Sequence, residues 1–208
     1  MTKTFTPSLV LLGLVSLLTL PACNSVAPES EPEGSGNQSG VPGTESSQLP
    51  RGWKTYTSQA GSFSIAMPGT PKEESRPIPL PTGGSVPLQI ASVDQRDTAY
   101  FTGFVDYPEG LINSNAIDVQ EILKSSIEGA AQQNFSGSPI NQQETTVDGV
   151  PCRRFDTAGQ LQGKDARMEG VFCLRGDRLF EVLIVGEDKE AFSDAAKEFI
   201  SSFKILKS

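Results

Sequence analysis

The sequence predicts an α+β fold in which an antiparallel β-sheet is flanked by two amphipathic helices. Segments of alternating apolar and polar residues, separated by turns rich in Gly, Pro and Asp, fill most of residues 51–208 and are typical of strands. Two further stretches, one in mid-chain and one near the C-terminal end, repeat apolar residues at helical spacing. Because a helix of this kind has one apolar face, the two helices are expected to cover the faces of the sheet.

The first part of this region is expected to form strands that end at turn residues. The strand segments are 53–58, 62–67, 88–95 and 99–107. Between the second and the third of them, residues 76–87 carry alternating prolines. Proline has no amide hydrogen to offer a strand ladder, so an extended edge or a loop is expected at 76–87.

A helix is expected next, because apolar residues from Val119 to Ala131 recur at the spacing of one helical face. Asn115 is the expected N-cap, since its side chain can accept a hydrogen bond from the first helical turn. The sequence FSGSP at 135–139 is expected to end this helix, because glycine and proline interrupt helical backbone.

Further strands are expected after this helix, and the strands of the domain are expected in meander order. The later segments are 140–147, 150–157, 166–175 and 178–186. Asp148-Gly149 and Gly176-Asp177 are typical of tight hairpin turns. The segment 178–186, RLFEVLIVG, is almost wholly apolar, so it is expected at the centre of the sheet.

The chain is expected to close with a second helix that Asp188 caps. Its apolar stripe runs from Phe192 to Phe203, at the spacing of one helical face. Lys204 would then lie near the C-terminal end of the helix, where the helix dipole favours a positive charge.

The start of the chain has the features of an export signal. Lys3 gives it a positive charge, and the apolar run Leu9–Leu20 is too short to span a bilayer but suits a signal peptide. The run ends in Leu-Pro-Ala-Cys, which resembles a bacterial lipobox, although Pro21 is atypical for that box. Residues 1–22 are therefore expected to be a lipoprotein signal peptide that is cut before a lipid-bearing Cys23. A plain secretory peptide with a chance cysteine is the alternative.

Residues 23–50 are expected to form the lipidated cysteine and a disordered tether. Of the 27 residues from 24 to 50, 14 are Gly, Pro or Ser, four are Glu and none is basic. Such a segment cannot bury enough apolar surface to offset the entropy that ordering would cost. As a flexible coil its ends lie about 30 Å apart, so the domain at 51–208 would stand away from the membrane.

Cys152 and Cys173 are expected to form a disulfide, because they remain as an even pair in an exported chain once Cys23 carries lipid. They lie on neighbouring expected strands, in a register whose paired residue numbers sum to 325. That register puts Phe155 and Phe172 on the core side and the two cysteines on the other face. Free buried thiols and a redox pair are the alternatives, although the chain has no C-x-x-C motif.

Composition excludes several classes of function. The chain has 17 basic and 25 acidic residues and a net charge of −8, which makes it a poor candidate for nucleic-acid binding. It has no histidine, which removes Ser-His-Asp and Cys-His catalysis and the usual zinc sites. We therefore expect no catalytic residue, no metal ligand, no cofactor and no nucleic-acid partner.

Two groups of residues remain as candidates for a site. Acidic residues gather around the third and fourth strand segments, where they would form a two-carboxylate site, a cation site or a solvated strand end: Asp94, Asp97, Asp106 and Glu109. Aromatic residues either line a ligand groove or pack in the core: Trp53, Tyr56, Tyr100 and Tyr107. In both groups the structural interpretation is favoured.

The motifs GSFSIAMPGTP and FISSFKIL, together with a mid-chain helix, resemble those of PsbP/DcrB-like domains over roughly residues 52–206. The resemblance implies a PsbP-like α/β sandwich in an extracytoplasmic lipoprotein of a cyanobacterium or another bacterium. It also implies an accessory module tethered to a membrane; in the photosynthetic branch such domains associate with photosystem II on the lumenal side. No binding motif of that branch is present, so the resemblance supplies no site residue.

These observations predict a non-enzymatic lipoprotein that is anchored by lipid at Cys23 to the periplasmic or lumenal face of a bacterial membrane. Its domain would dock on a membrane or envelope protein complex. One alternative is a lipoprotein that binds lipid or a small molecule, which would need an apolar cavity between helix and sheet. The second is a carboxylate enzyme, which would need convergent buried acids with raised pKa values.

Overall fold

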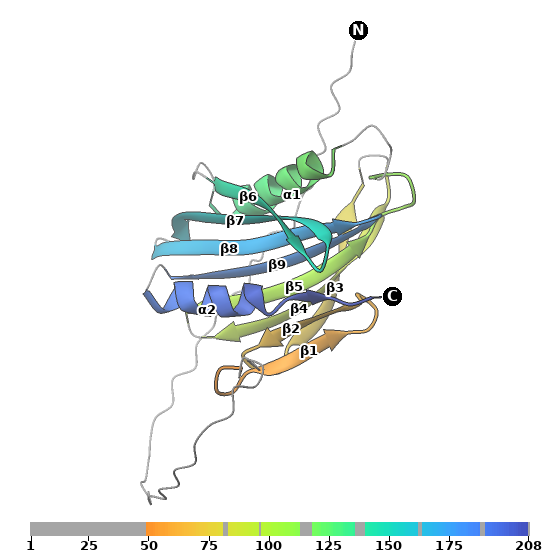
Figure 1. The fold of residues 1–208 in the computed structure, drawn as a ribbon. Helices are drawn as coiled ribbons and strands as arrows, with labels where there is room; N and C mark the ends of the chain where they lie inside the picture. The colour runs from red at the N-terminus through yellow and green to blue at the C-terminus, as the bar shows by residue number, and fades with distance from the viewer. Residues whose placement is uncertain are drawn as a thin grey trace, which may run out of the picture. The chain divides into compact units, whose positions relative to one another are not determined.

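The computed structural model describes residues 49–80, 83–95, 97–112, 118–135, 140–161, 164–187 and 190–207. The predicted signal peptide, Cys23, the tether up to residue 48, Asn115 and Asp188 lie outside these residues. The described residues form an α+β fold of antiparallel sheets and helices, as the sequence predicts (Figure 1).

The large sheet is antiparallel throughout and contains seven strands among the described residues. In spatial order they are β3 (Lys72–Pro79), β4 (Ser85–Gln95), β5 (Thr98–Asp106), β9 (Arg178–Glu187), β8 (Lys164–Arg175), β7 (Val150–Leu161) and β6 (Ile140–Val147). The apolar strand β9 lies in the middle, which confirms its predicted central position. The prediction of a single meander is wrong, because β9 pairs with β5 and so joins two separate meanders, β3–β5 and β6–β9.

The edge strand β3 confirms the predicted extended edge at residues 76–79, whereas residues 85–87 belong to the inner strand β4 and depart from the prediction. Residues 76–79 belong to β3, and β4 already begins at Ser85. Pro77 faces Pro87 across the β3–β4 ladder. Pro87 also lies just outside the β4–β5 ladder, whose first pair is Leu88 with Val105. Both prolines therefore lie at positions where the lack of an amide hydrogen costs the sheet few hydrogen bonds.

A smaller sheet contains β1 (Lys54–Ser58), β2 (Phe63–Met67) and β10 (Lys204–Ile205), with β2 in the middle. The sequence predicts β1 and β2 but not β10. Helix α2 (Glu190–Ser201) ends before Phe203, so the prediction that Phe203 belongs to the apolar stripe of this helix is wrong. The chain leaves the helix because Phe203 packs on Phe63 in the core, while the Ile205 amide donates to the Asp148 carboxylate at 2.9 Å.

Helix α1 (Val119–Asn134) begins later than Asn115 would place it. Its N-cap is Asp118, which has an extended backbone and accepts a hydrogen bond from the Gln120 amide at 2.9 Å. An aspartate side chain in this geometry satisfies a free amide of the first turn. The helix ends at Asn134, next to the start of the FSGSP segment that is predicted to end it.

Both faces of the large sheet are buried, each under a different cover. Alternate residues of β9 show this, since Leu179 packs in the core beneath α1 and Phe180 in the core beneath α2 and the small sheet. The predicted β7–β8 register is confirmed, with Cys152 opposite Cys173 and Phe155 opposite Gly170. The prediction that only the Phe155 face is core is wrong, because both cysteines are fully buried on the α2 side.

The structure joins Cys152 and Cys173 by a disulfide with an Sγ–Sγ distance of 2.03 Å. Further along the two strands, the same register places Asp156 opposite Glu169, so that two negatively charged side chains face each other. Arg154 lies 3.8 Å from the Glu169 carboxylate, and Arg167 lies 4.0 Å from it. The two arginines therefore offset the repulsion between the carboxylates.

Candidate functional site

A groove of about 610 Å³ lies between the β1–β2 hairpin and strands β3, β4 and β5. Residues 56–60 of the hairpin form one wall. Side chains that three neighbouring strands present on one face form the floor. Across the sheet, Thr102 stands opposite Ala91 and Ala91 opposite Glu73, so these three share that face.

Tyr56 and Glu73 join the hairpin wall to the floor. The Tyr56 hydroxyl donates a hydrogen bond of 2.8 Å to the Glu73 carboxylate. Burial, together with this bond and the charge of Glu73, raises the pKa of Tyr56 to about 12. The phenol therefore keeps its proton at neutral pH and serves as a donor to the carboxylate.

Thr102 is a buried polar residue in the floor of the groove. It is only 1% exposed, and its hydroxyl oxygen has no hydrogen-bond partner within the part of the chain that the structure describes. A buried hydroxyl of this kind costs free energy, because it has lost its bonds to water and gained none in return. Its position in a groove makes it a candidate for contact with a ligand.

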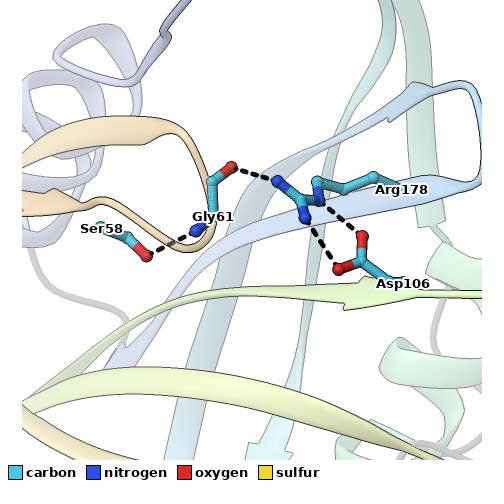
Figure 2. A network of polar contacts seen from close by, with 4 residues as sticks. All are labelled: Ser58, Gly61, Asp106 and Arg178. Carbon is cyan, nitrogen blue, oxygen red and sulfur yellow. Dashed lines mark hydrogen bonds and ion pairs between the residues drawn. The ribbon is translucent and has the colours of Figure 1, made fainter. Parts of the chain in front are cut away.

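Arg178 attaches the hairpin to the sheet through Gly61 and through Asp106, a residue that lines the groove (Figure 2). Its guanidinium makes two bonds to the Asp106 carboxylate, of 2.6 and 2.7 Å, and a third of 3.1 Å to the Gly61 carbonyl. The Gly61 amide donates to the Ser58 hydroxyl at 3.0 Å. The guanidinium also lies over the Phe104 ring, 4.8 Å from its centre. A planar, bidentate contact of this kind fixes orientation as well as distance.

Gly61 is required at this attachment. A Cβ atom at this position would lie 2.5 Å from the Phe63 ring and 2.8 Å from the Phe104 ring, which is closer than real contacts allow. Glycine therefore lets the hairpin backbone reach Arg178 over two aromatic rings.

The charges around the groove are mostly acidic. Glu74 pairs with Arg76 and lies 3.7 Å from the Lys72 ammonium, and Asp106 pairs with Arg178. Within the described part of the chain, Glu73 has no cation at ion-pair distance and only Tyr56 as a hydrogen-bond partner. The groove thus holds one exposed carboxylate whose charge is not matched.

The predicted carboxylate group is divided between the two ends of strand β5. Asp94 and Asp97 lie at the β4–β5 turn, whereas Asp106 and Glu109 follow the far end of β5. The nine residues of β5 separate them by about 27 Å, at roughly 3.4 Å per residue. These four acids therefore form no common site, and the described residues contain no group of three potential metal ligands.

The predicted aromatic groove contains one of its four residues. Tyr56 lines the observed groove, but Trp53 packs edge-on against buried Tyr100, with ring centres 5.6 Å apart. Tyr107 is buried on the opposite face of the sheet, under α1. For these last three residues the alternative interpretation, core packing, is correct.

Two acids have raised pKa values, and they lie on opposite faces of the large sheet. Burial raises the pKa of Glu181 to about 8, and its carboxylate oxygen Oε1 has no hydrogen-bond partner among the described residues. Burial also raises the pKa of Glu169, although Arg154 and Arg167 oppose the shift. Glu181 stands opposite Phe172, on the α1 face, whereas Glu169 stands opposite Ile184, on the other face. These two acids do not converge on one substrate.

Neither Thr102 nor Glu181 is predicted from the sequence as a functional residue. Glu181 carries a visible signal, since it is the one acid inside the apolar segment RLFEVLIV. Thr102 carries none, because a threonine in a strand is ordinary.

Among the described helices, none is long and apolar enough to cross a membrane.

No family model matches the chain, and no curated protein matches it. Several solved structures resemble it, among them these three. Cyanobacterial PsbP (CyanoP) from Synechocystis sp. PCC 6803 is 12% identical, with a TM-score of 0.47, over 79% of this chain and 99% of that one. LpqN, involved in cell envelope biogenesis of Mycobacterium tuberculosis, is 14% identical, with a TM-score of 0.43, over 77% and 82%. PA94 from Pseudomonas aeruginosa, a putative regulator of unknown function, is 12% identical, with a TM-score of 0.36, over 65% and 83%.

These likenesses are remote in both identity and TM-score. They do not assign the chain to a family, and the resemblance to PsbP/DcrB-like domains stays a prediction from the sequence. The α+β class itself is evident from the strands and helices of the structure.

Proposed function

We propose that the protein is an extracytoplasmic lipoprotein, held to a membrane by lipid at Cys23, whose domain is a docking module without catalysis. The observation that carries this proposal is the open groove between the β1–β2 hairpin and β3–β5. Its wall and floor present hydrogen-bonding groups beside aromatic rings. This mixture is typical of surfaces that bind a protein partner.

The disulfide between Cys152 and Cys173 supports an extracytoplasmic location. Disulfides persist in oxidising compartments and are rare in the bacterial cytosol. Together with the lipobox at Leu20–Cys23, it favours export followed by anchoring. A tether of 27 residues would then hold the domain near partners in the same membrane, which raises their effective concentration to about the millimolar range.

The two alternative functions have less support among the described residues. The groove lies between strands, whereas the lipid-binding alternative needs an apolar cavity between helix and sheet. The carboxylate-enzyme alternative needs acids that converge, but Glu169 and Glu181 are on opposite faces and Asp106 is held by Arg178. Docking is therefore the function that the groove supports best.

The test is affinity purification of the full-length protein from solubilised membranes. We expect a membrane or envelope protein to co-purify, and we expect the mature chain to begin at Cys23 with the added mass of acyl chains. Deletion of residues 26–48, with Cys23 kept, should reduce recovery of that partner because the domain can no longer reach it. A soluble domain that turns over a substrate and fully complements a deletion strain would contradict the proposal.

A further inference from the structure

Two polar groups of this groove can accept further hydrogen bonds. Among the described residues, the exposed Glu73 carboxylate has only the Tyr56 hydroxyl as a donor and no cation beside it, and the buried Thr102 hydroxyl has no hydrogen-bond partner. They stand two strands apart in one cross-strand row, which places their backbones about 10 Å from each other. The residue between them is Ala91, whose side chain is a single methyl group, so little stands between the two polar groups.

The missing partner of both groups is a donor with a positive charge. A carboxylate accepts hydrogen bonds, and the hydroxyl of Thr102 can accept one as well. A lysine ammonium or an arginine guanidinium supplies several donors and balances the charge of Glu73. The net charge of −8 on the whole chain also favours the approach of a basic partner.

The rest of the groove suits the aliphatic part of such a side chain. The rings of Phe63 and Phe104 and the ring of Pro87 line it. Lysine and arginine bury their methylene stems along apolar surface while the charged head stays among polar groups. A stem along these rings would bring the head to Glu73.

We propose that this groove receives a lysine or arginine side chain of a partner protein, with its cationic head at Glu73 and Thr102. The proposal rests on the docking function proposed above and names the chemistry of the partner. A polypeptide is favoured over a free molecule because Glu73 and Pro87 are exposed and the groove is open, whereas small-molecule sites enclose most of their ligand. Because the Thr102 oxygen is covered, the cationic head reaches it only after neighbouring side chains change rotamer, a change that is common at protein interfaces.

Three variants of the full-length protein test the site. Glu73→Gln removes the charge and keeps the shape, and Thr102→Val removes the orphan hydroxyl and keeps the volume. Glu144→Gln is the matched control, because Glu144 is an exposed acid on β6, at the opposite edge of the large sheet. Thr102→Val should leave the melting temperature unchanged or raised, because it removes an unsatisfied buried group.

The probes are Nα-acetyl-lysine methylamide and Nα-acetyl-arginine methylamide, with Nα-acetyl-norleucine methylamide as the neutral control. They are titrated into detergent-purified protein, and the chemical shifts of the Thr102 methyl and the Tyr56 ring are followed. We expect saturable shifts with one or both cations, and a binding constant weakened about tenfold in Glu73→Gln, the effect of one charge-assisted hydrogen bond. Glu144→Gln should bind as the wild type does.

Equal shifts with norleucine, no shifts with either cation, or unchanged binding in Glu73→Gln would overturn the assignment. Tighter binding of a free diamine than of both peptides would overturn the choice of a polypeptide. Retention of the co-purified partner distinguishes failure of the basic-side-chain site from failure of the docking function. If the partner is retained equally by the wild type and by Glu73→Gln, docking stands and the basic-side-chain site is wrong. If retention falls in Glu73→Gln and in Thr102→Val but not in Glu144→Gln, both are supported.

Discussion

The two faces of the large sheet differ in how they are closed. On the α1 face the helix packs against β6, β7 and β8, and Glu181 is buried on the same face of the sheet with no hydrogen-bond partner among the described residues for one of its oxygens. On the other face α2 covers the centre of the sheet, but the β1–β2 hairpin leaves a groove over β3–β5. The same pleated backbone thus carries an interior on one side and an open groove on part of the other. The cover, not the sheet, decides which side can meet a partner.

The largest expected effect concerns the disulfide in the α2-side core. Replacing both cysteines, as Cys152→Ala with Cys173→Ala, should lower the free energy of unfolding by about 3 kcal/mol, since the bond closes a loop of 21 residues. Denaturant unfolding of the wild type and the double variant measures this difference. The native, unreduced wild type should have no alkylatable thiol at either position, and free reactive thiols there would contradict the disulfide.

The next effect would show that the α1 face is a sealed interior. Glu181 is protonated when folded, with a pKa of about 8 against its ordinary 4.5, so its contribution to stability is full below about pH 4.5 and is lost as the pH rises to about 8. The loss approaches about 1.4 kcal/mol per pH unit where the folded state alone holds the proton. Denaturant unfolding across this range should show that slope.

Glu181→Gln should remove that slope, because glutamine does not ionise. Glu144→Gln, which changes an exposed acid at the sheet edge, should keep it. An unchanged slope in Glu181→Gln would mean that the carboxylate is hydrated and that the α1 face is less closed than its packing indicates.

A smaller effect concerns the attachment of the hairpin that forms the groove. Asp106→Asn removes the charge that holds Arg178, and because Asp106 is about half exposed we expect a loss of only about 1 kcal/mol. The local consequence is larger than the global one, since Arg178 also binds the Gly61 carbonyl. Amide exchange should speed up at Gly61–Phe63 and stay unchanged in β9.

Glu144→Gln again serves as the control, because it breaks an exposed pair with Arg153 at the opposite edge. Equal protection of the hairpin amides in both variants would show that the clamp does not hold the groove wall.

Local pattern accounts for much of the fold. Asp148-Gly149 forms the predicted hairpin turn because both residues adopt positive φ, and the apolar run 178–186 lies at the centre of its sheet. The predicted end of α2 is wrong for a tertiary reason. Phe203 continues the helical spacing in the sequence, but in the structure it packs on Phe63 and lies outside the helix. Asp118 rather than Asn115 caps α1, since nearby residues of similar capping strength compete and backbone geometry decides.

The groove lies beyond local pattern for a physical reason. It forms where the hairpin at residues 54–67 lies over strands at 72–106. The alternation of apolar and polar residues predicts each strand, but it does not predict which face of the sheet the hairpin will contact. Its parts are ordinary in isolation: an exposed Glu73, a strand Thr102 and an arginine, Arg178, 72 residues from its partner Asp106. Only the register of β3, β4, β5 and β9 brings them together.

The central claim is that the groove, and not another face of the domain, meets the partner. A photo-crosslinking amino acid placed at Thr57, an exposed position in the groove wall, tests it most directly in living cells. The same amino acid at Thr145, an exposed threonine on β6 at the far edge of the large sheet, is the matched control. We expect a discrete crosslinked adduct from position 57 and none from position 145. Adducts from position 145 alone, or equally from both positions, would contradict it.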